Sequence, residues 1–380
     1  MIDFDKLLKV VLEQKASDLF ITAGLPPSIK VDGRMMPMSK TALTPDQARE
    51  IVHSTMSEAQ IQEFEEEREC NFAIHSPTVG RFRVSAFYQR NFAGMVLRRI
   101  ETHIPTCDEL KLPEAVKTLA MTKRGLIIFV GATGTGKSTS LAAMIGHRNE
   151  KSKGHIITIE DPIEFIHEHK GCMVTQREVG VDTPSFEVAL KNTLRQAPDV
   201  IMIGEIRTRE TMNHAVVFAE TGHLCLATLH ANNANQALDR IINFFPADRH
   251  DQIWMDLSLN LRGLIAQQLV PTVDGKGRCA AIEILINTPL IADLIKKGDV
   301  HALKEVMSKS NEQGMQTFDQ ALFQLYSAGD ISYEAALASA DSANDLRLMI
   351  KLSGGERSGP ATSPAAQGLS LEGGEDDLAM

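Results

Sequence analysis

The sequence of 380 residues has no uncharged apolar run that approaches the roughly 18 residues needed by a membrane-spanning helix. Residues 1–5 include two acids and lack the basic and apolar regions of a signal peptide. We therefore expect neither a membrane span nor a secretory signal. Any association with a membrane is expected to run through partner proteins.

Basic charge and paired cysteines are also scarce. The chain has 39 Lys and Arg residues against 49 Asp and Glu residues, a net charge of −10, whereas a nucleic-acid translocase normally presents a basic face. We therefore expect no nucleic-acid partner. The cysteines lie far apart, without a C-x-x-C pair or a histidine at metal-binding spacing, which predicts reduced thiols in a cytosolic protein. They are Cys70, Cys107, Cys172, Cys225 and Cys279.

The most informative segment that is present is GATGTGKS at residues 131–138, which matches the phosphate-binding pattern G-x-x-x-x-G-K-[ST] in full. An apolar run at 125–130 predicts a buried strand before it, and the spacing of apolar residues predicts a helix over 137–147. The residues expected to contact the nucleotide are Gly131, Ala132, Thr133, Gly134, Thr135, Gly136, Lys137, Ser138 and Thr139.

This strand, turn and helix start suit the binding of ATP and Mg²⁺. Backbone N–H groups of the glycine-rich turn converge on phosphate oxygens, and the helix N-terminus adds a partial positive charge. Lys137 is expected to reach the β- and γ-phosphates, and the hydroxyl of Ser138 is expected to bind Mg²⁺. A glycine turn followed by a lysine by chance is the weaker alternative.

Two clusters of acids follow predicted strands downstream. Glu160, Asp161 and Glu164 come after an apolar run at 155–159, and Glu205 follows another at 200–203. Ligands gather at the carboxyl ends of parallel strands, where a metal holder and a group that activates water are needed. Three acids at a strand end are more often a solvated turn, but the phosphate loop favours a catalytic interpretation. Glu205 stands where a Walker-B acid, linked to Mg²⁺, is expected.

A histidine lies at each end of the next apolar strand, predicted over 224–229. His230 follows the carboxyl end, where a group that senses the γ-phosphate is expected, and His223 precedes the strand. A single histidine at a strand end is more often structural. We favour a catalytic role for His230 and leave both interpretations open for His223.

The pattern along the chain predicts a small α/β domain over residues 1–100, a linker at 101–114, and an α/β ATPase domain with a mostly parallel sheet over 115–352. The smaller domain is expected to contain helices at 4–12, 44–56 and 57–69, strands at 18–22, 81–88 and 95–100, a hairpin at 28–38 and a turn at 91–94. A helical region is expected after Pro289. Residues 353–380 are rich in Gly, Ser and Pro and end in acids, so a disordered acidic tail is expected.

The motifs together resemble those of the type IV pilus retraction ATPases, the PilT/PilU family of the secretion-ATPase superfamily. The resemblance runs over residues 1–350 and rests on the phosphate loop, the acidic box TIEDPIE at 158–164, IGEIR at 203–207, the histidine box at 221–230 and GMQTFD at 314–319. It implies a PAS-like N-terminal domain, a RecA-like P-loop domain, and a homo-hexameric ring that hydrolyses ATP at the cytoplasmic base of a pilus. It also implies an inner-membrane platform protein as a partner.

The resemblance further implies roles for single residues. Glu164 would be the catalytic glutamate and Glu205 the Walker-B acid that holds Mg²⁺ through water. Arginines would form a basic clamp on the phosphates, because a guanidinium offers a planar fork of donors and keeps its charge. The candidates are Arg83, Arg98, Arg195, Arg207 and Arg240. For Arg83, the solvated face of a sheet is an equally good explanation from the residues alone.

Within the family the chain is most similar to the PilU-type accessory branch. It has GEIRT at 204–208 where PilT-like proteins usually read GEMRD, IADLIKKG at 291–298 in place of a helical segment tied to retraction, and QGLSLE at 367–372 in its tail. These departures put independent retraction in doubt and imply a PilT-like ATPase as a partner.

Other functions share parts of this sequence pattern. A nucleotide-bound scaffold for a PilT-like motor remains open. A secretion or assembly ATPase usually has a longer N-terminal region and a four-cysteine metal site, and this chain has neither. A small-molecule kinase lacks an evident acceptor pocket, and the acidic charge disfavours a helicase.

Overall fold

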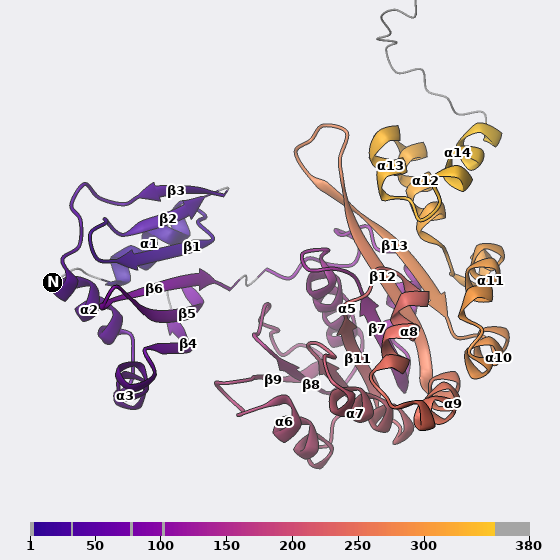
Figure 1. The fold of residues 1–380 in the computed structure, drawn as a ribbon, viewed down its shortest axis with the longest axis horizontal. Helices are drawn as coiled ribbons and strands as arrows, with labels where there is room; N and C mark the ends of the chain where they lie inside the picture. The colour runs from indigo at the N-terminus through magenta and orange to yellow at the C-terminus, as the bar shows by residue number, and fades with distance from the viewer. Residues whose placement is uncertain (1–3, 32, 77–78, 101–102, 354–380) are drawn as a thin grey trace, which may run out of the picture.

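The structure is a computed structural model that describes residues 4–31, 33–76, 79–100 and 103–353. It contains two sheets, which form the centres of two lobes lying side by side (Figure 1). The smaller lobe holds the N-terminal strands, and the larger lobe holds the remaining ones. Asp32 of the expected hairpin turn and residues 354–380 of the expected tail lie outside the described residues.

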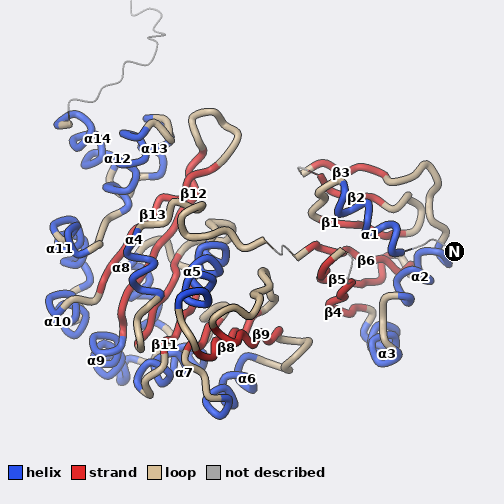
Figure 2. The backbone as a smooth tube through the Cα atoms, turned by 180° about the vertical axis from the view of Figure 1, so that it is seen from behind, coloured by secondary structure: helices blue, strands red, loops and turns tan. Residues whose placement is uncertain are grey.

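The smaller lobe is an antiparallel sheet with helices packed against it. Its strand order is β3-β2-β1-β6-β5-β4. The strands are β1 (Asp18–Thr22), β2 (Ser28–Val31), β3 (Arg34–Pro37), β4 (Glu69–Ser76), β5 (Gly80–Gln89) and β6 (Phe92–Arg99). The helices are α1 (Phe4–Glu13), α2 (Pro45–Ser54) and α3 (Glu58–Glu67), and α1 and α2 cover β1 and β6 (Figure 2).

Local sequence explains most of these elements. Thr44 and Ser57 begin α2 and α3 with capping boxes. In each box the side chain of this residue accepts the backbone N–H of a glutamine three residues later, and the glutamine side chain accepts the backbone N–H of the first residue. In β5, Phe82 and Val84 are fully buried on one face, as the alternation predicts. The expected helices and strands of this lobe are therefore found.

Two details of the smaller lobe differ from expectation. The turn expected over 91–94 is instead formed by Arg90 and Asn91, whose φ angles of +49° and +63° are left-handed, and β6 begins at Phe92. Two consecutive left-handed residues make the tight hairpin turn that suits the twist of antiparallel strands. Strand β4 was not expected, because the acidic residues before it continue a helical pattern up to its first residue.

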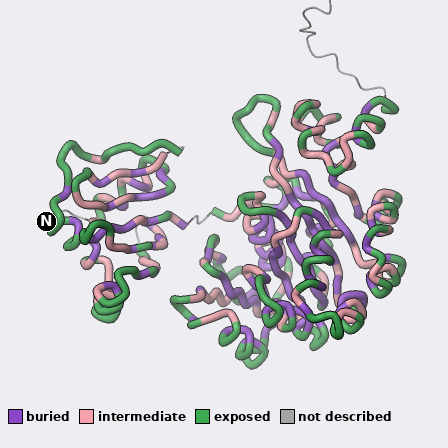
Figure 3. Tube along the Cα trace, in the orientation of Figure 1, coloured by how far each residue is buried: buried purple, intermediate pink, exposed green. Residues whose placement is uncertain are grey.

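The larger lobe has a seven-stranded sheet in the order β13-β12-β7-β11-β10-β8-β9, parallel except for the antiparallel pair β12 and β13. The strands are β7 (Gly125–Val130), β8 (Gly154–Glu160), β9 (Cys172–Glu178), β10 (Val200–Ile203), β11 (Leu224–Leu229), β12 (Leu261–Pro271) and β13 (Arg278–Ile286). Every residue of β7, β10 and β11 is buried, and the centre of the sheet is the buried part of the lobe in Figure 3.

Helices cover both faces of this sheet. Leu126 and Ile128 of β7 belong to one apolar cluster, whereas Ile127 and Phe129 belong to another on the opposite face. The helices are α4 (Glu114–Ala120), α5 (Lys137–Lys151), α6 (Phe186–Thr193), α7 (Arg209–Glu220), α8 (Ala234–Asn243) and α9 (His250–Asn260), with short 3-10 turns η1 (Leu194–Gln196) and η2 (Ala247–Arg249). The prediction of an α/β fold with a mostly parallel sheet is confirmed.

The chain after Thr288 is helical up to Leu352, as expected. It forms α10 (Pro289–Lys297), η3 (Val300–Ala302), α11 (Leu303–Lys309), η4 (Asn311–Gln313), α12 (Phe318–Ala328), α13 (Tyr333–Ser339) and α14 (Ala343–Leu352). The sequence pattern did not indicate β9, β12 and β13. Each of these strands has polar residues inside it, which interrupt the apolar run that marks a buried strand.

In the part of the chain that the structure describes, no helix combines the length and apolar character required to cross a bilayer.

Candidate functional site

The phosphate loop joins β7 to α5, as the sequence pattern predicted. Gly136 has a left-handed φ of +85°, and an added Cβ would lie 2.8 Å from the side-chain nitrogen of Gln267, so glycine is required there. Gln267 Nε2 donates a hydrogen bond to the carbonyl of Thr135 at 2.9 Å. Strand β12, which carries Gln267, therefore braces the loop from the side.

Lys137 is the first residue of α5 and is buried under the loop. Its Nζ donates hydrogen bonds to the carbonyls of Gly131 and Ala132, each at 2.8 Å. Burial lowers the pKa of Lys137, and the charges of Glu205 and Glu164 oppose that shift. The ammonium group is thus held at the centre of the loop, with two carboxylates close enough to affect it.

A cavity of about 290 Å³ lies where the loop meets the carboxyl ends of β8, β10 and β11. The parallel register brings these strand ends to the same edge of the sheet. The polar residues lining the cavity include Thr133, Lys137, Ser138, Glu160, Asp161, Glu164, Glu205, Arg207 and His230. The structure therefore gathers the acids and the histidine that the sequence singled out around one space.

The three acids after β8 have different environments. Glu160 is buried, and its Oε1 accepts hydrogen bonds from Thr158 Oγ1 at 2.6 Å and from Gln176 Nε2 at 3.1 Å. Burial raises the pKa of Glu160 to about 6. Asp161 and Glu164 are both exposed at the cavity wall, and Asp161 is an ion-pair partner of Arg207 at 3.6 Å. Glu164 is thus the carboxylate best placed to meet water.

A buried carboxylate supports the backbone just before Glu164. Glu178 Oε2, at the end of β9, accepts the backbone N–H of Ile163 at 3.3 Å. The same oxygen lies 3.3 Å from the guanidinium of Arg81, which comes from β5 of the smaller lobe. The acidic segment 160–164 is therefore connected to both lobes.

Glu205 lies between two groups at the end of β10. Its Oε1 is 3.0 Å from His230 Nε2, and its Oε2 accepts a hydrogen bond from Arg207 at 2.7 Å. Burial lowers the pKa of His230, and the positive charge of Lys137 acts in the same direction, whereas Glu205 opposes both. A neutral imidazole that donates from Nε2 to Glu205 fits this arrangement.

A second cavity of about 320 Å³ opens on the other side of the phosphate loop. It reaches from the start of α5 to β12 and β13. Its walls include Leu110, Gly136, Thr139, Ser140, Leu269, Arg278, Cys279 and Leu325. Two expected nucleotide contacts, Gly136 and Thr139, line this cavity, while Thr133, Gly134, Lys137 and Ser138 line the first.

The other candidate arginines are more scattered. Arg207 lines the first cavity, but Arg195 and Arg240 are exposed on η1 and α8 and are not among its lining residues. Arg83 and Arg98 are directly paired across β5 and β6 in the smaller lobe, and Arg98 is bonded to Asp18 at 2.8 Å. Like charges placed opposite each other are unfavourable without such a partner.

His223 is not brought to the cavity within this chain. It precedes β11, at the opposite end of the strand from His230, and its Nδ1 lies 3.1 Å from Thr221 Oγ1. Conversely, the sequence analysis missed Gln267, Gln176 and Glu178, which hold the loop and the acidic segment. The available signal was a polar side chain inside each of two strands.

Comparison with known proteins places this site in a family. The model of the family described as Type II/IV secretion system protein matches residues 1–324. The type IV pilus ATPase PilU of Pseudomonas aeruginosa is 72% identical over 377 residues, which cover 99% of this chain and 98% of that protein. The type IV pilus retraction ATPase PilT of the same bacterium is 42% identical over 334 residues, which cover 88% of this chain and 97% of that protein.

The fold is also similar to that of a solved PilT structure. A crystal structure of the pilus retraction motor PilT with bound ADP matches with a TM-score of 0.86 and 40% sequence identity, covering 92% of this chain and all of that one. The chain therefore belongs to the Type II/IV secretion system protein family and, within it, to the PilT/PilU group.

Proposed function

We propose that the chain is the ATP-hydrolysing subunit of a homo-hexameric motor at the cytoplasmic base of a type IV pilus, where it assists retraction together with a PilT-like ATPase. The observation that carries this proposal is the convergence of Lys137, Glu164, Glu205 and His230 on one cavity beside the phosphate loop. Two relatives are named as type IV pilus ATPases, and the PilT structure contains ADP.

In this proposal the residues divide the work of hydrolysis. Backbone N–H groups of the loop and Lys137 bind the phosphates. Glu164 orients and deprotonates the attacking water, because it is the exposed carboxylate of the cavity that is not paired with Arg207. His230 and Arg207, both bonded to Glu205, report on the terminal phosphate.

The oxygen donors around the first cavity fit Mg²⁺. The Ser138 hydroxyl and the Glu205 carboxylate line the same space, and Mg²⁺ prefers such ligands together with substrate phosphates and water. Among the residues that the structure describes, no group of three His, Cys, Asp or Glu side chains is arranged to hold a metal alone. The ion would therefore be held by Ser138, by Glu205 through water, and by the nucleotide, where it neutralises phosphate charge.

The second cavity is the proposed site of the adenine base. It is continuous in sequence with the loop through Gly136 and Thr139, and its walls are largely apolar, as an aromatic base requires. Leu110 and Leu269 face the space from the segment before α4 and from β12. The nucleotide would then extend past the loop, with its phosphates toward the first cavity.

The ring and its partners rest on the family relationship and on the arginines. Arg83 lies two residues from Arg81 on the same face of β5, and Arg81 reaches the larger lobe. We propose that Arg83 and Arg98 complete the phosphate clamp when the lobes rotate, with Arg195 and Arg240 acting at a neighbouring subunit. An inner-membrane platform protein of the pilus is the proposed docking partner.

The test is the rate of ATP hydrolysis by the purified protein as a function of its concentration. Specific activity is expected to rise and then level off, because each site is completed between subunits. Lys137→Ala is expected to abolish turnover, whereas Lys153→Ala, at an exposed lysine before β8, should leave it unchanged. Flat specific activity would contradict the ring, and equal activity in Lys137→Ala would contradict the site.

A nucleotide-bound scaffold for a PilT-like motor is the second candidate, and α10 favours it. This helix carries the departure at 291–298, and it presents an exposed Leu290 and an Asp293–Lys297 ion pair at 2.6 Å. Cells that contain only this ATPase distinguish the two functions. Retraction in such cells excludes strict dependence on a partner, whereas binding of ATP without turnover favours the scaffold.

A further inference from the structure

A carboxylate is buried inside the larger sheet, away from the first cavity. Glu283 lies on β13 opposite Ala266 of β12, and it is 0% exposed. Its neighbours Ile282 and Ile284 are also buried. Burial of an ionisable side chain costs free energy unless hydrogen bonds compensate for it. The contacts of Glu283 therefore indicate why a carboxylate is present here.

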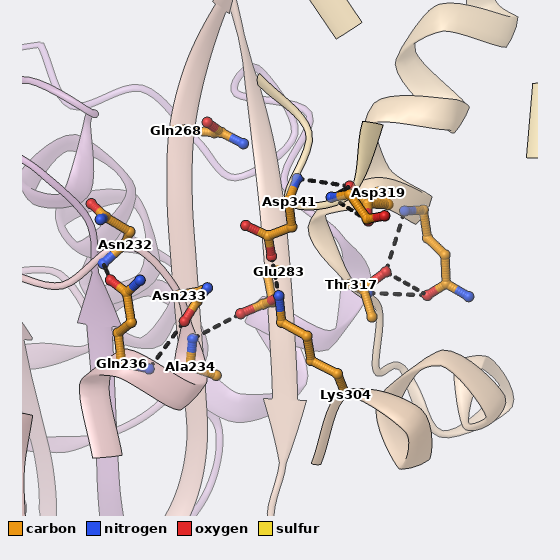
Figure 4. Close-up of polar contacts among 12 residues, drawn as sticks. Asn232, Asn233, Ala234, Gln236, Gln268, Glu283, Lys304, Thr317, Asp319 and Asp341 are labelled. Atoms are coloured by element: carbon orange, nitrogen blue, oxygen red, sulfur yellow. Dashed lines mark hydrogen bonds and ion pairs between the residues drawn. The ribbon is translucent and has the colours of Figure 1, made fainter. Parts of the chain in front are cut away.

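One of these contacts holds the first turn of α8. Glu283 Oε1 accepts the backbone N–H of Ala234, the first residue of this helix, at 2.8 Å (Figure 4). The preceding residue, Asn233, is the N-cap, and its side chain accepts the N–H of Gln236 at 3.0 Å. Amide groups at a helix N-terminus carry partial positive charge, which a carboxylate complements. Two side chains thus fix where α8 begins.

This turn follows His230 closely in the chain. Only residues 231–233 separate His230 from Ala234. Asn232, in that segment, donates its backbone N–H to Gln236 Oε1 at 3.2 Å, so the segment is itself attached to α8. His230 Nε2 lies 3.0 Å from Glu205 Oε1. Displacement of the first turn of α8 would therefore change the distance between His230 and Glu205.

The other side of Glu283 faces the C-terminal helices. Figure 4 shows its side chain between the start of α8 and a cluster formed by Lys304, Asp319 and Asp341. Lys304 and Asp341 form an ion pair. Asp319 accepts the backbone N–H of Asp341 at 2.9 Å. Charges from α11, α12 and the segment before α14 therefore surround the far side of the carboxylate.

The electrostatic environment of Glu283 agrees with its position between α8 and the C-terminal helices. Burial raises the pKa of Glu283 to about 7, and the N–H groups of Ala234 and Phe318 and the charge of Lys304 oppose that shift, whereas Asp341 adds to it. Phe318 is the first residue of α12, so two helix N-termini favour the ionised form. Among the described residues, Glu283 Oε2 has no hydrogen-bond partner of ordinary geometry. A purely structural role would be served as well by an apolar side chain.

We propose that Glu283 is a positioning residue of the nucleotide site, which joins the first turn of α8, and thereby His230, to α11, α12 and the segment before α14. The proposal rests on the proposed function, in which the cavity at Lys137 hydrolyses ATP. Glu283 does not touch that cavity and acts through His230. The C-terminal helices are in this way linked to the group that faces the terminal phosphate.

The test is a double-mutant cycle between Glu283→Gln and His230→Ala. Glutamine keeps one acceptor oxygen, but its NH₂ group would face the N–H of Ala234 or of Phe318, at the start of α8 or α12, where two donors cannot bond. The kcat for ATP is expected to fall about tenfold while the KM changes less than about twofold, since the phosphate loop is untouched. In the double variant, kcat should be no lower than in His230→Ala alone, because both changes remove the same interaction. Independent, multiplying losses would overturn the proposal.

Two further variants separate positioning from loss of folding. Asn233→Ala removes the other side chain that fixes the first turn of α8, so it should reproduce the kinetic effect without altering Glu283. Thr288→Ala removes the N-cap of α10, a helix that supplies none of the charged side chains around Glu283 and does not begin beside His230, and should leave the cycle unchanged. If Glu283→Gln does not fold, Asn233→Ala carries the test, and normal kcat in that variant contradicts the proposal.

Hydrogen exchange separates this proposal from the proposed function. In Glu283→Gln, amides of residues 230–238 are expected to exchange about tenfold faster, while those of the phosphate loop stay the same. Unchanged exchange at 230–238 contradicts the positioning role, whether or not the protein hydrolyses ATP. If the unsubstituted protein hydrolyses ATP no faster than Lys137→Ala does, while exchange at 230–238 is faster in Glu283→Gln, only the proposed function is contradicted.

Discussion

At the scale of single residues, environment separates carboxylates that look alike in the sequence. Glu160 is buried and doubly hydrogen-bonded, Glu205 is shared by His230 and Arg207, and Glu164 is exposed at the cavity. Only a carboxylate that meets water can activate it, and only one that is not already saturated by donors can accept its proton. Because the exposed Asp161 is paired with Arg207, this distinction supports the proposed role of Glu164 as general base.

The assignment predicts the effect of Glu164→Gln. Turnover of ATP is expected to fall about 100-fold or more, because the amide cannot accept the proton of the attacking water. Affinity for ATP should change little, since the loop residues that bind phosphate are untouched. The matched control is Glu168→Gln, at an exposed acid that does not line the first cavity. Normal turnover in Glu164→Gln would remove this residue from catalysis.

The pKa of Glu283 makes a second prediction, about stability. Burial raises this pKa from 4.5 to about 7, so the folded chain holds the proton more tightly than the unfolded chain. The contribution of Glu283 to the free energy of unfolding is fully present below pH 4.5 and is lost as the pH rises through about 7. The change in this free energy is about 3 kcal/mol. Thermal unfolding of the unsubstituted chain and of Glu283→Gln should be compared from pH 5 to 8.

As the pH rises, the stability of Glu283→Gln is expected to increase relative to that of the unsubstituted chain, because the variant lacks the titrating group. Glu160, whose pKa burial raises to about 6, contributes the same slope to both proteins and cancels in the difference. A difference in stability that stays constant from pH 5 to 8 would show that the pKa of Glu283 is not raised in the folded chain.

At the scale of elements, the phosphate loop depends on a strand far away in sequence. Gln267 on β12 donates to the carbonyl of Thr135 in the loop, whereas its neighbour Gln268 points to the other side of the strand and donates to the carbonyl of Ser339 at the end of α13. Successive side chains of a strand face opposite sides, which explains the difference. The two glutamines therefore form a natural pair for comparison.

This geometry predicts different effects for the same substitution at adjacent positions. Gln267→Leu leaves the carbonyl of Thr135 without its donor and should weaken ADP binding about tenfold. Gln268→Leu removes a bond of similar length on the other face and should leave ADP binding within about twofold. Calorimetric titration of both variants with ADP provides the measurement. Equal affinities would show that the loop does not need the brace from β12.

At the scale of the whole molecule, an ion pair connects the smaller lobe to the acidic segment 160–164. Arg81 of β5 and Glu178 of β9 are 97 positions apart and meet at 3.3 Å. The side chain of Glu178 is only 5% exposed and also accepts the N–H of Ile163, next to Glu164. Rotation of the smaller lobe would therefore reach Glu164, the proposed general base, through the carboxylate of Glu178.

This connection predicts that Arg81→Met and Glu178→Gln each lower kcat by about tenfold, because the first removes the cation that holds Glu178 in place and the second weakens the acceptor of the Ile163 N–H. The two changes combined should cost no more than one, since they act through the same contact. Arg34→Met, at an exposed arginine of β3, is the control. Losses that multiply in the double variant would separate Arg81 from the acidic segment.

Several elements could be predicted because their signals are local. The strands β7, β8, β10 and β11 are apolar runs followed by polar residues, and the capping boxes of α2 and α3 are complete within four positions. The edge strands β9 and β13, and β12 beside β13, could not be predicted in the same way. Their polar residues, such as Gln176, Gln267 and Glu283, are explained only by partners elsewhere in the fold.

The same reason separates what the sequence by itself determined from what the tertiary structure decided. The phosphate loop, the parallel sheet and the residues at its carboxyl edge follow from local patterns, because a strand, a glycine-rich turn and a helix start are specified by neighbouring positions. The exposure of Glu164, the sharing of Glu205 and the brace from Gln267 depend on contacts over distances as long as 132 positions in the chain. Those contacts exist only once the larger sheet has formed and its helices have packed against it, so only the tertiary structure could decide them.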